Sequence, residues 1–126
     1  MTPSFPWISI ASLLGGTAVL FGAFAAHGLE GKVEPKAVEW VKTGAFYQLT
    51  HALALMGWAL WCEFKVRSGL SPSALTGGCF AIGTLIFSGT LYAMALGAPR
   101  WLGAVTPLGG ALLILGWTVW AVSSLK

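Results

Sequence analysis

Charged residues are scarce in this chain. Its 126 residues include only seven Lys or Arg and four Asp or Glu, together 9%. Soluble domains carry about a quarter of their residues as Asp, Glu, Lys or Arg, so an ordinary water-exposed globular fold is excluded. No cluster of Lys and Arg is present, and we therefore expect no nucleic-acid partner. The length allows a single domain.

Metal ligands and nucleophile motifs are equally sparse. Cys62 and Cys79 are too few for a disulfide framework and lack metal-ligand spacing, so both are interpreted as core residues. His27 and His51 would lie at different depths of a helical bundle and could not face each other across a haem. A zinc site needs more ligands at one depth. Without a Ser or Cys nucleophile motif or paired intramembrane carboxylates, we expect no cofactor, no metal and no enzymatic activity.

The chain consists largely of long apolar runs, and 56% of its residues are hydrophobic. The first run lacks any charge, and its ~21 residues would rise ~31 Å as a helix, which matches the hydrocarbon core of a bilayer. A signal peptide is the alternative, but a positive n-region is missing and three more apolar runs follow. The sequence predicts an all-α membrane protein, an up-down bundle of four transmembrane helices in the lipid bilayer. The expected helices cover residues 7–28, 35–62, 72–96 and 101–123.

Two of these boundaries have alternatives. Residues 29–42 hold more than half of the charged residues, and Glu34-Pro35 is typical of a helix start. The segment 35–42 is therefore either an interfacial beginning of the second helix or a solvated loop. For the last helix, Thr106-Pro107 forms either a cap and first turn or, if the helix begins near Trp101, a proline kink.

Four spans place both termini on one side, called side A, together with the loop 63–71. Side B then receives residues 28–42 and 97–106. The Lys and Arg residues divide almost evenly between the two sides, but those of side B are interleaved with three glutamates. The positive-inside rule therefore favours, narrowly, a cytoplasmic side A with both termini inside the cell.

The second run, Thr43–Cys62, carries polar residues that a lipid-facing helix would lack. At about 100° per residue, Tyr47, Gln48 and His51 fall on one face. A rise of ~1.5 Å per residue places His51 about 12 Å from side B, and the third run brings hydroxyls to similar depths. We predict a polar intramembrane cluster in the half of the bundle nearest side B. Its members are His27, Tyr47, Gln48, His51, Ser88, Tyr92 and Thr106, with Arg100 in the adjacent loop.

Three interpretations of this cluster are open. In the first, the polar side chains only join helices, at roughly 0.5–2 kcal/mol each, through hydroxyls or backbone carbonyls. We expect His51 to bond to a residue of the third or fourth helix, with Ser88 or Tyr92 favoured. In the second, the polar side chains line a pocket or half-channel that binds a small ligand or moves protons through His51. In the third interpretation the chain is an accessory bundle that packs with itself or with a larger membrane complex. His51 has no intramembrane counter-ion and should be neutral at about pH 7.

The order and spacing of four segments resemble one family. The combination of GAFAAHG, YQ-x-x-HALAL and TP-x-GG is similar to the bacterial family known as domain of unknown function 423, which has small transmembrane relatives in eukaryotes. The connector 98–105 resembles the family less. The resemblance implies a four-span protein of the bacterial inner membrane and implies no particular activity. The matching segments are FGAFAAHGLE (21–30), TGAFYQLTHALAL (43–55), SGTLYAMAL (88–96) and TPLGGALLILGW (106–117).

Overall fold

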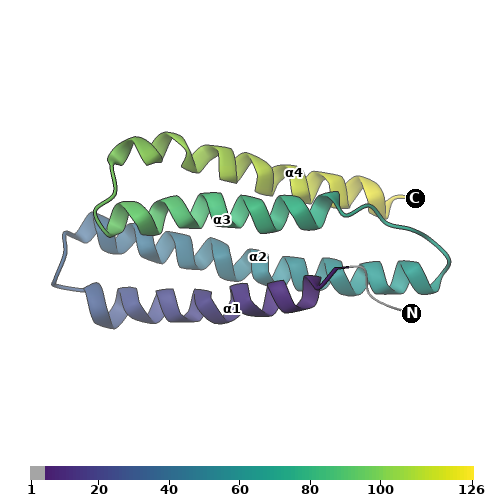
Figure 1. The fold of residues 1–126 in the computed structure, drawn as a ribbon, viewed down its shortest axis with the longest axis horizontal. Helices are drawn as coiled ribbons and strands as arrows, with labels where there is room; N and C mark the ends of the chain where they lie inside the picture. The colour runs from purple at the N-terminus through teal and green to yellow at the C-terminus, as the bar shows by residue number, and fades with distance from the viewer. Residues whose placement is uncertain (1–4) are drawn as a thin grey trace.

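The computed structural model describes residues 5–126 of the chain, and these residues form helices and connections without a β-strand. The four long helices run in alternating directions, and Figure 1 shows the start of α1, the α2–α3 connection and the end of α4 at one end of the bundle, which is side A. The predicted all-α, up-down architecture is confirmed. In chain order the elements are α1 (Trp7–Ala23), the π-helix η1 (Phe24–Leu29), α2 (Pro35–Arg67), α3 (Leu75–Ala95), the 3-10 helix η2 (Arg100–Ala104) and α4 (Thr106–Ser124).

Each long helix packs against its neighbour in the chain, so the four helices form a row with α1 and α4 at its two edges (Figure 1). The α3–α4 contact is close because Gly109 has no side chain. A Cβ atom at Gly109 would lie 2.8 Å from the carbonyl oxygen of Gly83 and 2.9 Å from the Cα of Phe87. Backbones that approach so closely gain van der Waals contacts over their whole length, which is the main source of helix association within lipid.

Three segments are long and apolar enough to cross a membrane: Trp7–Leu29, Leu75–Ala95 and Arg100–Ser124. Helix α2 is not among them, because Tyr47, Gln48 and His51 lower the hydropathy of its central part. That part nevertheless carries no charge between residues 43 and 62, and α2 lies packed between α1 and α3. Helix α2 therefore crosses the membrane together with its two neighbours, and its Gln48 and His51 are buried within the bundle.

Helix α2 is longer than expected, with 33 residues that rise about 50 Å, against a hydrocarbon thickness of about 30 Å. It begins at Pro35, so the segment 35–42 is helical rather than a loop. At its other end it passes the expected limit at residue 62 and continues to Arg67, because residues 63–67 contain neither Gly nor Pro. The Lys65 ammonium lies 5.3 Å from the centre of the Trp61 ring in this extension.

The remaining helices also differ from expectation at their ends. Helix α3 begins at Leu75 rather than 72, after a turn in which the Leu75 N–H donates to Ser73 Oγ at 3.1 Å. Helix α4 begins at Thr106 rather than 101, since Pro107 lacks an N–H and fits only the first turn. The five residues before Val105 form η2 instead. The first run continues through η1 to Leu29.

Candidate functional site

Gln48, in the middle of α2, joins three helices through one side chain. Its amide nitrogen donates to the Leu14 carbonyl oxygen at 2.8 Å and to Thr17 Oγ1 at 2.6 Å, both on α1. Its amide oxygen accepts a hydrogen bond from the Tyr92 hydroxyl of α3 at 2.8 Å. Gln48 is only 5% exposed, and both of its amide hydrogens are used. A polar side chain in lipid is therefore fully enclosed by protein partners.

The position of Tyr92 depends on two neighbours. Phe21 of α1 stacks on the Tyr92 ring with centroids 3.9 Å apart and an interplanar angle of 11°. On α2, a Cβ atom at Gly44 would lie 2.6 Å from Cε1 of Tyr92, so only glycine leaves room for the ring. The Ser88 hydroxyl, one turn earlier on α3, donates to the Gly44 carbonyl oxygen at 2.7 Å. These contacts direct the Tyr92 hydroxyl toward Gln48.

His51 lies one turn further along α2 and contacts α4. The indole N–H of Trp117 donates to Nε2 of His51 at 2.9 Å. Because an indole nitrogen only donates, Nε2 must be unprotonated, and the ring proton of the neutral imidazole lies on Nδ1. Nδ1 is 2.8 Å from the Tyr47 carbonyl oxygen and donates to it. His51 is 6% exposed, and both of its nitrogens are occupied.

His51 bonds to a residue of α4, one of the two helices expected to hold its partner, and to a backbone carbonyl oxygen, but the two favoured residues were wrong. Ser88 and Tyr92 bond to Gly44 and Gln48 rather than to His51, because α3 presents these hydroxyls one turn nearer side B. The ring of Tyr47 does not face the interior either. It is 40% exposed and contacts Phe87, with ring centroids 4.8 Å apart, so Tyr47 contributes its carbonyl oxygen and not its hydroxyl.

Two further members of the predicted cluster lie apart from this polar layer. His27 is exposed within η1, and its side chain forms no hydrogen bond to another residue of the described range. Thr106, at the start of α4, has its hydroxyl 2.6 Å from that of Thr90 and stabilises the α3–α4 pair. The structure brings Gln48, Tyr92 and Ser88 together between α2 and α3, and His51 lies beside them.

One hydroxyl of the interior is unsatisfied. Thr84 is 1% exposed, and among the described residues its Oγ1 is the buried side-chain polar atom without a hydrogen-bond partner. It lies one turn before Ser88 and two turns before Tyr92 on α3, so the three hydroxyls follow one face of that helix. A buried hydroxyl without a partner costs about 1–3 kcal/mol, so this position lowers stability rather than raising it.

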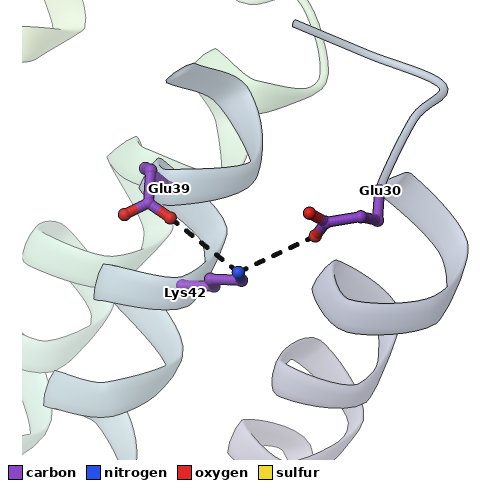
Figure 2. Close-up of polar contacts among 3 residues, drawn as sticks. All are labelled: Glu30, Glu39 and Lys42. Atoms are coloured by element: carbon purple, nitrogen blue, oxygen red, sulfur yellow. Dashed lines mark ion pairs between the residues drawn. The ribbon is translucent and has the colours of Figure 1, made fainter. Parts of the chain in front are cut away.

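The charged residues of side B form a separate, exposed rim. Figure 2 shows the Lys42 ammonium between two carboxylates, 3.7 Å from Glu30 and 3.9 Å from Glu39. Arg100 bonds to Glu34 at 2.8 Å, and its guanidinium lies 5.4 Å from the Trp40 ring centre. These pairs tie the two side-B connections to the start of α2. Exposed ion pairs of this kind contribute only about 0–1 kcal/mol.

Sequence reasoning missed two members of the polar layer. Trp117 was not predicted, because tryptophan is typical of the membrane interface, yet its place in α4 puts it about 16 Å from Thr106 at ~1.5 Å per residue, near the depth of His51. Counting depth along α4 would have found it. Thr17 was missed because it lies in an apolar run without charge, although it is one of the few hydrogen-bonding side chains of α1.

Residues 5–126 contain no group of three His, Cys, Asp or Glu side chains that could hold a metal ion. Two cavities, of 730 Å³ and 370 Å³, lie at the side-A end around Trp58, and neither is lined by Gln48, His51 or Tyr92. The polar layer itself is closed by hydrogen bonds and aromatic rings.

Apolar helices arranged up and down around a hydrogen-bonded polar layer define a small integral membrane protein. Residues 21–110 match the family described as "Protein of unknown function (DUF423)", and the chain belongs to this family. The matched segment includes Gly44, Gln48, His51, Ser88 and Tyr92, but ends before Trp117.

Similar proteins occur in distant bacteria. The chain is 38% identical to the UPF0382 membrane protein of Haemophilus influenzae, over 95% of this chain and 94% of that protein. It is 38% identical to the UPF0382 membrane protein YwdK of Bacillus subtilis, over 86% and 87%. It is 34% identical to the UPF0382 inner membrane protein YgdD of Escherichia coli K12, over 100% and 93%. No solved structure matches the chain.

Proposed function

We propose that this chain is a structural or accessory helical bundle of the bacterial inner membrane, with neither enzymatic nor transport activity. The inner-membrane location follows from the name of the Escherichia coli relative. The observation that carries the proposal is the closed bonding of the polar layer. Gln48 bonds to α1 and α3, Ser88 bonds to α2, and His51 bonds to α4, so each of these three buried side chains joins helices.

The main competing function is a proton or solute pathway through His51. A relay histidine needs one ring nitrogen that can accept a proton and a group beyond it that can pass one on. In this layer the partner of Nε2 is an indole N–H, which donates but does not accept, and Nδ1 is held by a backbone carbonyl oxygen. This arrangement favours a fixed hydrogen bond over proton transfer.

The outer surfaces support association with another membrane protein or with a second copy of the chain. Helix α1 lies at the edge of the row (Figure 1), and its Leu13, Val19 and Leu20 are exposed. A Cβ atom at Gly16 on the same helix would meet nothing within 4 Å. Small residues beside long apolar ones let another helix approach closely. We therefore propose a homo-oligomer or membership of a larger membrane complex.

The closed-layer proposal is tested by flux through liposomes that contain the purified protein. We expect proton and small-solute flux equal to that of empty liposomes, both for the wild type and for His51→Leu. Flux above this background in the wild type that disappears in His51→Leu would contradict the proposal and support the pathway.

Association is tested by mass measurement of the protein in native-lipid nanodiscs. We expect a species larger than the monomer, and we expect Gly16→Leu to reduce it by filling the space where a second helix would approach. Gly78→Leu is the matched control, because Gly78 also has open space around it but lies on α3. A wild type that is strictly monomeric would overturn this part of the proposal.

A further inference from the structure

The smaller of the two side-A cavities has the composition of an anion site. It encloses 370 Å³ between the end of α2, the start of α3 and the end of α4. Its charged lining residues are Lys65 and Lys126, and no Asp or Glu lines it. Ser71, Ser73 and Ser123 add hydroxyl groups, and of these Ser73 accepts the Leu75 N–H and keeps its own hydrogen free to donate.

The neighbouring cavity provides an internal comparison. It encloses 730 Å³ on the α1 side of the same loop and shares Trp58 and residues 71–73 with the first cavity. Its charged lining residue is Glu63, and no Lys or Arg of the described chain lines it. Two adjacent cavities with a common wall thus differ in charge, and only the one beside α4 suits an anion.

Lys65 is also free of competing side-chain carboxylates among the described residues. At side B, Lys42 and Arg100 are paired with glutamates. No ion pair joins Lys65 to a carboxylate within residues 5–126, and its ammonium lies over the ring of Trp61 instead. Its charge therefore remains available to a ligand in the cavity.

The depth of the cavity indicates where that ligand comes from. Trp58 and Trp61 line it together with Lys65, and aromatic rings combined with Lys mark the level of the lipid headgroups. The molecules that meet the chain at this level are phospholipids. Basic pockets between transmembrane helices bind the headgroups of anionic lipids.

We propose that the cavity lined by Lys65 and Lys126 binds the phosphate-bearing headgroup of an anionic phospholipid. The two ammonium groups neutralise the headgroup charge, and the serine hydroxyls donate to phosphate oxygens. The acyl chains extend along the apolar outer surface of α2 and α4. This proposal is independent of whether the polar layer around His51 is closed.

The test is lipid retention, measured by native mass spectrometry on the full chain after equilibration in micelles containing equal amounts of phosphatidylglycerol and phosphatidylcholine. We expect selective retention of phosphatidylglycerol by the wild type. We expect Lys65→Gln to reduce it about fivefold, and a further reduction when Lys126→Gln is added. Arg67→Gln is the matched control, because it removes a nearby charge that does not line the cavity.

A second variant separates the cavity from general surface charge. Ser71→Phe keeps both lysines but fills the space, and we expect it to lose the lipid as well. Circular dichroism must show unchanged helix content in every variant compared. Equal retention of the two lipids by the wild type would overturn the proposal, as would equal loss in Lys65→Gln and Arg67→Gln. Release of the lipid by millimolar inorganic phosphate would identify a site for soluble anions and would also overturn it.

Discussion

The polar groups of the two halves of this molecule differ in whether they have hydrogen-bond partners within the protein. Toward side B the interior carries uncharged groups, and Gln48, Ser88 and His51 are bonded to neighbouring helices and enclosed. At the side-A end the polar groups are lysines and serines around an open cavity, with no carboxylate facing Lys65. The difference teaches that a polar residue in a small membrane bundle can stabilise the helices or be available to a ligand, and that its hydrogen-bond partners distinguish the two roles.

The largest expected effect is on the enclosed half, at Gly44. Gly44→Ala adds a Cβ atom 2.6 Å from the Tyr92 ring, which must move away from Gln48. We expect a loss of about 3 kcal/mol in the free energy of unfolding, from steric strain and a broken hydrogen bond together. Unfolding by SDS in mixed micelles measures it. Gly16→Ala, on an open surface, is the control and should change little; equal effects at both glycines would contradict the packing described here.

A somewhat smaller loss is expected for Gln48→Leu. This change removes three hydrogen bonds that join α2 to α1 and α3, each worth about 0.6 kcal/mol in membrane proteins, so we expect a loss of about 2 kcal/mol. Tyr92→Phe removes only one of them and should cost about a third as much. A double-mutant cycle in the same unfolding assay gives their coupling. Zero coupling would show that the two side chains do not bond.

In the same half, a substitution at Thr84 is expected to raise the free energy of unfolding rather than lower it. Thr84→Val replaces a buried hydroxyl that has no partner with a methyl group of similar size. We expect the free energy of unfolding to rise by about 1 kcal/mol. Ser88→Ala is the matched control, because it removes a hydroxyl that is bonded and should lower stability. A loss of stability in Thr84→Val would reveal a partner for the Thr84 hydroxyl.

The smallest expected effects on stability concern the exposed charges at the two ends. Lys42→Gln breaks exposed ion pairs at side B, and Lys65→Gln removes an unpaired charge at side A. Each should change the free energy of unfolding by less than about 0.5 kcal/mol. The two variants should differ in lipid retention, which only Lys65→Gln reduces. If Lys42→Gln alone destabilised the protein, the rim of side B would be part of the stabilising core.

The sequence by itself determined the fold class, the up-down order and most of the polar residues in the interior. Apolar runs of membrane length, separated by Gly, Pro and charged segments, leave few other architectures for a chain with so little charge. A simple count of depth also placed Ser88 and Tyr92 near the polar face of α2. These features depend only on the order of residues along each segment. The fixed rise and rotation per residue of a helix then give the depth and the face of each side chain.

The pairing of the side chains was decided only by the tertiary structure. Whether His51 meets Ser88, Tyr92 or Trp117 depends on how α3 and α4 are rotated about their axes. That rotation is set by close approaches at glycines such as Gly44 and Gly109, which have no periodic signal of their own. The two cavities likewise depend on where the loop after α2 lies against α1 and α4. Contacts between residues far apart in the chain decide these features, and no single segment contains them.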